Sequence, residues 1–332
     1  MSDGVNRIES VCSMRWVRCP PSTSEEIALA AGLNERYVRE WLAAMVTGEI
    51  VRIDPVSDKF ELPPSHAACP TRANPSDNMA VFAQYIPGLG YVEDEIVECF
   101  EKGGGVPYEK FPRFHAVMEE DSGQSVVSSL ETHILPLMDG LINRLTEDIR
   151  VLDLGCGRGC ALIQMASAFP NSTFVGYDLS ESEITHARTV ASQDELTNVS
   201  FEVRDLSDFD ETADVEAYDL VTTFDAVHDQ AFPLRMVKGI RRTLKADGVY
   251  LMQDIHCSSD VANNVDHPLG TLLYTVSCLH CMTVSLAQGG EGLGAIWGRE
   301  TAEALLAEAG FGSVEIHRLE HDVQNDYFIV RR

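Results

Sequence analysis

Apolar positions in the second half of the chain follow two alternating patterns. From about residue 149, short runs of consecutive apolar residues, typical of strands buried on both faces, alternate with longer runs at helical spacing. This alternation predicts a doubly wound α/β domain over residues 149–332, with a mostly parallel sheet covered by helices. Two successive strand patterns at the end of the chain predict an antiparallel edge. The predicted strands read RVLDLG, TFVGYDLS, VSFEVRDL, YDLVTTFDAV, VYLMQDIH, SVEIHRL and YFIVRR.

Helical patterns connect these strands. One helix is expected over CALIQMASAFP, and the next, SESEITHARTVASQ, begins with a serine that can cap it. RMVKGIRRTLKADG is expected to end at Gly248, and GRETAEALLAEAGFG is the last helix. The longest nearly apolar run, Thr271–Ala287, is interrupted by Ser, Thr and His. It therefore predicts a buried helix rather than a membrane span.

Residues 1–72 carry a different pattern, although residues 1–22 lack a clean amphipathic helix. Two short helices are predicted next: Thr23 or Ser24 caps the first, Gly32 ends it, and Asn34 caps the second. IVRIDPVSDKFELP follows as a hairpin with an Asp-Pro turn, which completes a winged-helix arrangement. The apolar face of the second helix is expected to hold Val38, Leu42, Ala43 and Met45.

Charge limits the partners of this module and of the whole chain. A DNA-binding winged helix places its second helix in the major groove, but residues 1–72 contain eight Lys or Arg and ten Asp or Glu, a net charge of −2. We therefore expect a packing and dimerisation role, with DNA binding as the alternative. The formal charge of −27 makes nucleic acid an unlikely partner and disfavours anionic membranes. Nine cysteines and the lack of a signal-peptide core predict reduced thiols and a cytoplasmic location.

The intervening residues 73–148 predict helices with a glycine-rich break, EKGGGVPYEKFPRFHAVMEED. Three glycines and two prolines stand beside Tyr108, Phe111, Phe114 and His115. The break is expected to form either an aromatic flap or an ordinary loop between helices. In the first case Tyr108, Phe114 and His115 are candidate substrate contacts.

The first predicted strand ends in a glycine-rich loop, VLDLGCGRGCALI. Its glycines are Gly155, Gly157 and Gly159, so the third comes one residue too early for the dinucleotide fingerprint G-x-G-x-x-G. Asp153 precedes them, whereas a pyrophosphate site needs amide donors and no nearby carboxylate. The loop therefore favours a ligand with a cationic centre and no phosphate.

Two further acids end the next two predicted strands. Asp178 is placed to hold ribose hydroxyls, and Asp205 is placed near an adenine amine. Three acids at three successive strand ends, with the alternating glycines, resemble the class I S-adenosylmethionine-dependent methyltransferases. The fold of that family is a Rossmann-like seven-stranded sheet with an antiparallel edge.

The resemblance extends over nearly the whole chain after about residue 22. LNERYVREWLAAM, GGGVPY, FPRFH, DLGCGRG, HDQ and SLAQGG are similar to segments of a bacterial and animal group of winged-helix methyltransferases. The resemblance implies S-adenosyl-L-methionine as cofactor, a small-molecule methyl acceptor and a homodimer joined through the N-terminal module. The implied cofactor residues are Asp153, Gly155, Gly157, Gly159, Asp178, Leu179, Asp205, Leu206, Phe224 and Asp225.

His228 is the candidate catalytic residue. Plant-type winged-helix O-methyltransferases carry a catalytic histidine in a similar HDW context, so the resemblance implies that His228 is a general base. Gln230 stands in place of that Trp, and a role in shaping the pocket is the alternative for His228.

A group of soft side chains follows the fifth predicted strand. Its C-L-H-C spacing crowds ligands into one turn and no Cys-x-x-Cys pair repeats, so we expect no metal site in it. A pocket wall suited to an apolar or thiol acceptor is expected instead, with His256 and His280 as candidate substrate contacts. The group consists of His256, Cys257, His267, Cys278, His280 and Cys281.

The function predicted from these features is methyl transfer to an oxygen or sulfur nucleophile of a small molecule. An oxygen acceptor would need His228, whereas a thiol forms its thiolate more readily near neutral pH. The alternatives are a regulator that senses S-adenosylmethionine and binds DNA through the winged helix, and a non-catalytic scaffold that binds S-adenosylmethionine.

Overall fold

The computed structural model describes residues 20–67, 80–111 and 113–332. The chain divides into two compact units, Met1–Gln84 and Tyr85–Arg332. The expectation for residues 1–22 lies almost wholly outside the described residues.

Capping residues define the helices of the first unit. The Thr23 hydroxyl accepts a hydrogen bond from the Glu26 amide, and the Glu26 carboxylate accepts one from the Thr23 amide, forming a capping box. Gly32 ends this helix in the left-handed region at φ 69°, and Asn34 caps the next. The elements are α2 (Ser24–Ala31), α3 (Glu35–Thr47), β1 (Arg52–Asp54), β2 (Lys59–Glu61), α4 (Pro64–Ala67) and α5 (Ala80–Ala83).

The core of the first unit confirms the predicted apolar face of α3 except at one position. Val38 and Leu42 are buried against Ile27 and Phe60. Ala43 is exposed, because one residue beyond Leu42 the helix has turned by about 100°. The hairpin β1–β2 is antiparallel and pairs Ile53 with Phe60, as expected for the wing.

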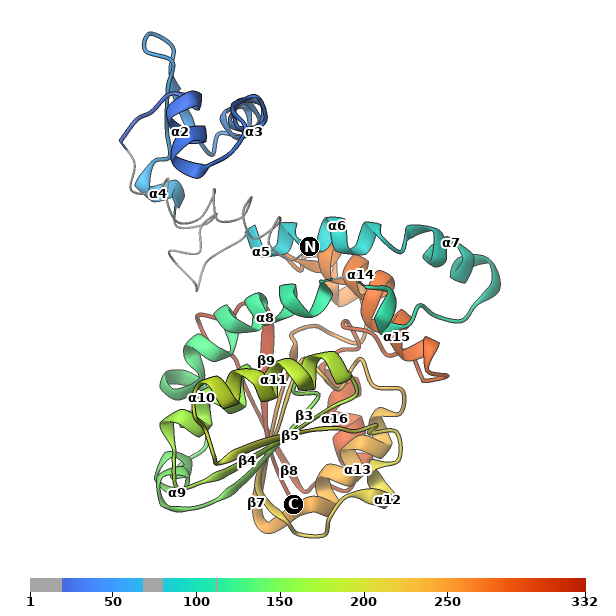
Figure 1. The fold of residues 1–332 in the computed structure, drawn as a ribbon. Coiled ribbons are helices and arrows are strands. Elements are labelled where there is room, and N and C mark those ends of the chain that lie inside the picture. Colours follow the sequence, from blue (N-terminus) through green and yellow to red (C-terminus); the bar gives the residue numbers. More distant parts are fainter. Residues whose placement is uncertain (1–19, 68–79, 112) are drawn as a thin grey trace. The chain divides into compact units, whose positions relative to one another are not determined.

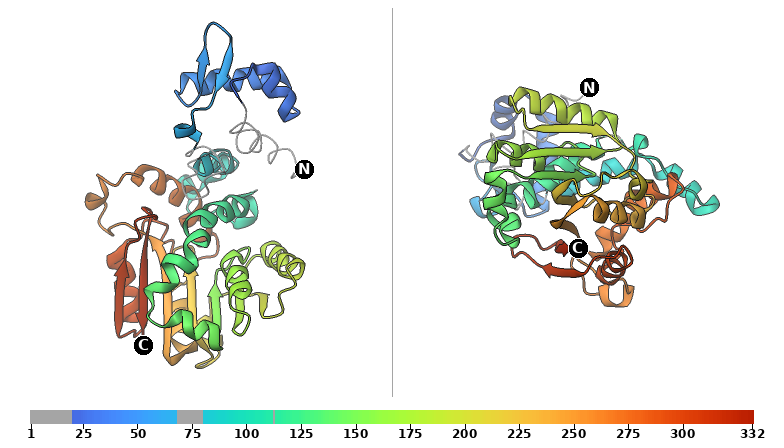
Figure 2. Two further views of the ribbon diagram at one scale, coloured as in Figure 1. Left: turned by 90° about the vertical axis from the view of Figure 1, so that its left-hand side faces the viewer. Right: turned by 90° about the horizontal axis from the view of Figure 1, so that it is seen from below.

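The second unit is built on a seven-stranded sheet in the order β5-β4-β3-β6-β7-β9-β8 (Figures 1 and 2). All neighbouring strands are parallel except β9, which is antiparallel to both β7 and β8. The predicted Rossmann-like sheet and its antiparallel edge are therefore confirmed. The strands are β3 (Arg150–Leu154), β4 (Thr173–Asp178), β5 (Val199–Val203), β6 (Tyr218–Phe224), β7 (Leu244–Ile255), β8 (Ser313–His317) and β9 (Asn325–Arg331).

One boundary differs from the prediction. Helix α13 (Pro233–Thr243) ends five residues before Gly248, and β7 begins directly at Leu244. The register between β6 and β7 shifts between Tyr218 and Leu220. A Cβ on Gly248 would lie 3.1 Å from the Lys245 carbonyl oxygen, so the glycine allows the strand to continue through this irregular stretch.

Helices cover both faces of the sheet (Figure 1). Residues of α10 and α11 pack with Val151 of β3 in one apolar cluster, whereas α13 and α16 pack with Leu152 in the other. β3 is thus buried on both faces, as its continuous apolar run predicts. The helices not yet given bounds are α6 (Tyr85–Gly90), α7 (Glu93–Lys102), α8 (Phe114–Ser125), α9 (Leu141–Glu147), α10 (Cys160–Ala168), α11 (Glu181–Gln193), α12 (Phe209–Thr212), α14 (Gly270–Val276), α15 (Met282–Ala287) and α16 (Arg299–Glu308).

The apolar run near residue 280 forms one helical segment with a π-helical turn, η8 (Ser277–Cys281), between α14 and α15. By length and composition alone, Gly270–Ala287 would also be able to cross a membrane. A core helix passes the same test, and Leu273, Cys281 and Val284 are buried within the unit. The segment thus has the buried residues that the sequence predicts.

Candidate cofactor and acceptor site

A cavity of about 660 Å³ opens at the carboxyl ends of β3, β4, β5 and β6. Most of the predicted site residues line it, whereas Gly159, His228, His256 and His280 do not. The predicted cofactor residues on its wall are Asp153, Gly155, Gly157, Asp178, Leu179, Asp205, Leu206, Phe224 and Asp225, and the predicted substrate contacts there are Tyr108, Phe114 and His115.

The three glycines of the loop serve different purposes. All have positive φ, at 72°, 51° and 73° for Gly155, Gly157 and Gly159. A Cβ on Gly155 would lie 2.6 Å from the Ala226 Cβ, and one on Gly159 would lie 2.4 Å from the Phe201 ring. No atom lies within 4 Å of the corresponding point on Gly157. Two glycines therefore permit packing, and the cavity-lining Gly157 leaves room for a ligand against the backbone.

Asp178 fixes the loop through its own carboxylate. Its Oδ2 accepts a hydrogen bond from the Gly157 amide at 2.8 Å, and its Oδ1 accepts one from the Ser180 amide at 2.8 Å. Burial raises the pKa of Asp178, while these two amide donors oppose that rise. The carboxylate thus joins β4 to the glycine loop at the cavity wall.

Asp153 is buried more deeply. Its Oδ1 accepts a hydrogen bond from the Thr222 hydroxyl at 2.7 Å. Burial raises the pKa of Asp153 to about 7, with the Thr222 hydroxyl opposing the rise and Asp178 adding to it. Asp205 is less enclosed, and its Oδ1 accepts from the Ser207 amide at 2.8 Å.

Asp225, which follows β6, has an unusual backbone conformation and a carboxylate oxygen without a hydrogen-bond partner among the described residues. Its φ of 49° is positive, which is uncommon for a residue other than glycine. Its Oδ2 accepts a hydrogen bond from Gln253 at 2.9 Å, whereas its buried Oδ1 has no hydrogen-bond partner among the described residues. Burial and the nearby Asp254 raise the pKa of Asp225. Such strain and unmet bonding capacity are typical of functional positions.

His228 lies behind the cavity, between two carboxylates. Its Nδ1 contacts the Asp254 Oδ1 at 2.7 Å, and its Nε2 lies 3.4 Å from the Asp229 Oδ1. Burial lowers the pKa of His228, but Asp254 and Asp229 outweigh burial and hold this pKa well above its ordinary value. Asp229 itself lines the cavity and accepts a hydrogen bond from the Tyr108 hydroxyl at 2.7 Å.

His280 is fully buried in an aromatic cage. Its ring stacks on Phe114 with centroids 3.4 Å apart, and the rings of Phe111 and Tyr108 meet it edge-on. Neither ring nitrogen has a hydrogen-bond partner among the described residues. Burial, with His115 and His228 nearby, holds the pKa of His280 well below its ordinary value. The structure thus places this predicted substrate contact behind the cavity-lining aromatic residues.

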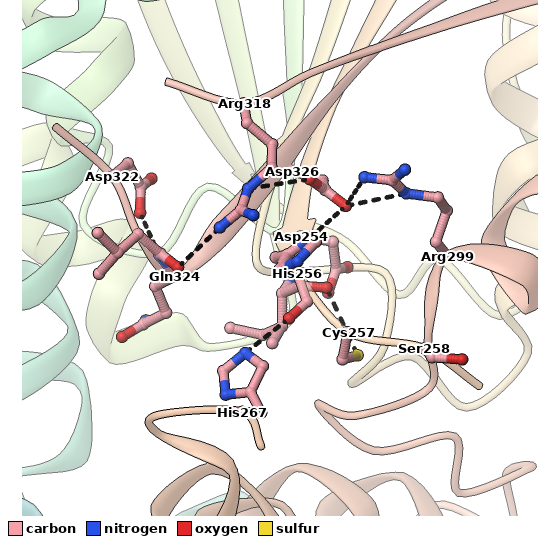
Figure 3. Close-up of polar contacts among 12 residues, drawn as sticks. Asp254, His256, Cys257, Ser258, His267, Arg299, Arg318, Asp322, Gln324 and Asp326 are labelled. Atoms are coloured by element: carbon pink, nitrogen blue, oxygen red, sulfur yellow. Dashed lines mark hydrogen bonds and ion pairs between the residues drawn. The ribbon is translucent and has the colours of Figure 1, made fainter. Parts of the chain in front are cut away.

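His256 belongs to a separate polar cluster at the end of β7 (Figure 3). Its Nδ1 contacts the Asp326 Oδ2 at 3.0 Å, and the Arg299 Nη2 donates to the same oxygen at 2.8 Å. His267 contacts the His256 carbonyl oxygen at 2.9 Å. Through the buried Asp326 these contacts join the end of β7 to β9 and α16. His256 does not line the cavity.

Sequence reasoning missed several residues of the site. Asp229 directly follows His228 and is the member of the pair that reaches the cavity. Arg158, between two loop glycines, donates to Glu119 of α8 at 2.6 Å and to Glu183 of α11 at 2.7 Å. A cation inside a glycine-rich loop, with acids on the flanking helices, was the available signal for this bridge.

Comparison with known proteins agrees with this geometry. Residues 145–304 match the family model of a methyltransferase domain, and residues 14–72 match the Rv2258c-like winged HTH domain. The ubiquinone biosynthesis O-methyltransferase of Coxiella burnetii is 31% identical over 106 residues, which make up 32% of this chain and 43% of the relative. The match thus spans less than half the length of that curated relative.

Solved structures share the fold over nearly the full chain. An O-methyltransferase family protein from Burkholderia thailandensis has a TM-score of 0.68 at 17% identity, covering 100% of this chain and 96% of its own. Human N-acetylserotonin methyltransferase, solved in complex with S-adenosylmethionine, has a TM-score of 0.67 at 16% identity, with coverages of 99% and 92%.

The fold and the site together define an α/β methyltransferase. Residues 145–304 match a methyltransferase domain, residues 14–72 match a winged helix-turn-helix domain, and the fold is shared with solved methyltransferases, one of them in complex with S-adenosylmethionine. S-adenosylmethionine is the cofactor of this class.

The residues of the cavity fit this cofactor. S-adenosylmethionine carries a positive sulfonium and an ammonium group, and the cavity wall holds the carboxylates of Asp178, Asp205 and Asp225. The open space at Gly157 allows close approach of a ligand to the backbone. The charge and the shape of the cavity wall therefore fit S-adenosylmethionine.

Proposed function

We propose that this protein transfers a methyl group from S-adenosylmethionine to an oxygen or sulfur nucleophile of a small molecule. One observation carries the proposal: the glycine loop, the strand-end acids and the Tyr108–Asp229 pair line a single cavity. The cofactor supplies an electrophilic methyl group on a sulfonium. Gly155, Gly157, Asp178, Asp205 and Asp225, which line this cavity, would hold it.

The acceptor must lose its proton as it attacks the methyl group, and Asp229 is the group in position to take it. Asp229 lines the cavity, and the Tyr108 hydroxyl orients its Oδ2. The His228 Nδ1 contacts Asp254, and the His228 Nε2 lies 3.4 Å from the other Asp229 oxygen, Oδ1. The role of His228 as the general base itself stays a prediction. The geometry favours an Asp229–His228 pair in which the carboxylate faces the acceptor and the imidazole positions it.

Aromatic side chains at the start of α8 and just before it supply the acceptor surface. Tyr108, Phe114 and His115 line the cavity, and the Tyr108 and His115 rings stack with centroids 5.6 Å apart. This wall suits an acceptor with a flat or apolar body. The cavity, at about 660 Å³, lies in the usual range for small-molecule sites.

Methylation assays test the proposal. Purified protein is incubated with methyl-labelled S-adenosylmethionine and a panel of phenols and thiols, and label transfer is counted. Label in an organic product with wild type, and its loss in Asp229→Asn at unchanged cofactor affinity, would support the assignment. Cofactor binding without transfer to any phenol or thiol would contradict it and favour a scaffold.

The regulator alternative is not favoured by the winged unit. Arg36 and Arg39 of α3 form ion pairs with Glu40 and Glu35 of the same helix. Basic side chains that are paired with neighbouring acids are poorly placed to neutralise DNA phosphates. Fluorescence anisotropy with random-sequence duplex DNA provides the test, and salt-sensitive binding by wild type would restore this alternative.

A homodimer and a cytoplasmic location are part of the proposal. Helices α6 and α7 and the turn between them expose the apolar side chains of Ile86, Tyr91, Val97 and Phe100, and exposed apolar side chains favour contact with another subunit. Six described cysteines are free thiols, in line with a reducing compartment. Light scattering after gel filtration would show a dimer, and a monomer at micromolar concentration would contradict this part.

A further inference from the structure

We propose that His228, Asp229 and Cys281 bind a divalent transition metal, zinc foremost, at the acceptor side of the cavity. One donor atom from each residue lies within 4.8 Å of the other two. Imidazole nitrogen, carboxylate oxygen and thiolate sulfur are the three ligand types that zinc takes in proteins. The metal site stands on geometry alone, while its catalytic role rests on the proposed methyl transfer.

The separation of two donors matches zinc coordination. The His228 Nε2 and the Asp229 Oδ1 lie 3.4 Å apart, too far for a good hydrogen bond. With zinc bonds of about 2.0–2.2 Å to nitrogen and oxygen, the edge of a tetrahedral site is about 3.3–3.5 Å. These two atoms therefore already stand at the separation of two zinc ligands.

Outer hydrogen bonds orient both of these ligands. The His228 Nδ1 contacts the Asp254 Oδ1 at 2.7 Å, and the Trp297 indole donates to the same oxygen at 3.0 Å. The Tyr108 hydroxyl donates to the Asp229 Oδ2 at 2.7 Å. A carboxylate behind the histidine and a donor behind the carboxylate are the usual outer shell of a metal site.

The three carboxylates around His228 also favour the binding of a cation. Asp225, Asp229 and Asp254 surround a single imidazole. Each of these carboxylates has one buried oxygen without a hydrogen-bond partner among the described residues. Buried carboxylates are costly unless each is paired, and a single imidazole does not pair with all three. A divalent cation at the Asp229 Oδ1 would satisfy one such oxygen and offset the excess negative charge.

Three protein ligands leave one position of a tetrahedral zinc site open, the arrangement of catalytic zinc centres. Of the three ligands only Asp229 lines the cavity, and the proposal places the open position on its side, where the acceptor binds. A thiol bound there would release its proton to solvent, since Asp229 would then hold the metal and would no longer serve as the proton acceptor. Its sulfur lone pair would form the new carbon–sulfur bond as the bond from the methyl carbon to the cofactor sulfur breaks. The substrate class is then a thiol, and the product a methyl thioether.

The sequence led us to expect no metal site, an expectation argued from the spacing within the segment from His256 to Cys281, and the proposed site departs from it. The proposed site takes only Cys281 from that segment and joins it to a pair that follows β6. Cys278 lies on the same π-helical turn, Ser277–Cys281, outside the three-residue group. It is therefore the matched control for Cys281.

Cobalt titration tests the site without any activity assay. Full-length protein is freed of metal by a chelator and dialysis, then titrated with Co²⁺, followed by displacement with Zn²⁺. Wild type and Cys278→Ser are expected to bind one equivalent with a thiolate-to-cobalt band in the near ultraviolet. Cys281→Ser should lose that band, and Tyr108→Phe should weaken Zn²⁺ binding about tenfold or more.

Calorimetry with S-adenosylhomocysteine on the same samples separates the possible failures. Variants that bind this product normally are folded at the site, so loss of metal in them supports the proposal. A wild type that binds the product but gives no cobalt band overturns the metal site and leaves the proposed function standing. A cobalt spectrum that is unchanged in Cys281→Ser and in Asp229→Asn overturns the ligand assignment.

Discussion

Asp153 makes the stability of the fold depend on pH in a direction opposite to that of most carboxylates. The side chain is 3% exposed and its folded-state pKa is raised to about 7, first by burial. In the unfolded chain the same group titrates near 3.9. The folded protein therefore keeps a proton that the unfolded chain releases between about pH 4 and pH 7. The contribution of Asp153 to stability falls as pH rises through this window, and it levels off above it.

The magnitude follows from the two pKa values. A difference of about 3 in pKa corresponds to about 4 kcal/mol at high pH. Asp153→Asn is nearly isosteric, cannot ionise and still accepts a hydrogen bond from Thr222. Its stability relative to wild type should therefore rise by about 2–3 kcal/mol between pH 5 and pH 8.

Urea unfolding of wild type and variant at pH 5, 6.5 and 8 provides the assay, since the difference between them cancels all other titrating groups. Asp266→Asn, at an exposed position, controls for the removal of one negative charge. A difference between Asp153→Asn and wild type that is the same at all three pH values would show that burial does not hold the Asp153 proton.

Three further substitutions test the site and its loop. Asp178→Ala should weaken S-adenosylhomocysteine binding about 100-fold in calorimetry, because two amide hydrogen bonds of the loop are lost. Gly159→Ala should destabilise the protein by about 2–4 kcal/mol in urea unfolding, since its Cβ meets the Phe201 ring at positive φ. Tyr108→Phe should lower kcat about tenfold with unchanged cofactor affinity, because Asp229 loses its orienting donor.

Control variants and contradicting outcomes accompany these three substitutions. Asp194→Ala alters an exposed acid, and cofactor affinity reduced equally in both Asp variants would argue against a specific role for Asp178. Gly123→Ala lies within α8 with open space around the new Cβ, and helix propensity makes it neutral or stabilising. An equal loss of stability at both glycines would contradict the packing argument. For Tyr108→Phe, an unchanged kcat would remove the hydroxyl from the mechanism.

The sheet and the cofactor side of the cavity were predictable because their signals are local. Continuous apolar runs mark buried strands, and parallel strands bring their carboxyl ends to one edge. Asp153, Asp178 and Asp205 therefore reach one cavity without any knowledge of the turns between them. The glycine spacing marked the loop, although it did not show that Gly159 serves packing against Phe201.

The acceptor side was less predictable because it depends on contacts between distant segments. Asp254 reads as one residue of a buried strand, and only the fold sets it against His228. His256 pairs with Asp326, 70 residues further on. The π-helical turn Ser277–Cys281 breaks the 3.6-residue periodicity, so the direction of His280 and Cys281 was not evident from spacing.

Isothermal calorimetry of the wild-type protein with S-adenosylmethionine tests the central claim most directly. One cofactor per chain is expected to bind saturably with micromolar affinity, since the glycine loop and the strand-end acids line one cavity. Folded protein that gives no binding heat with S-adenosylmethionine, and none with S-adenosylhomocysteine at a second temperature, would contradict it.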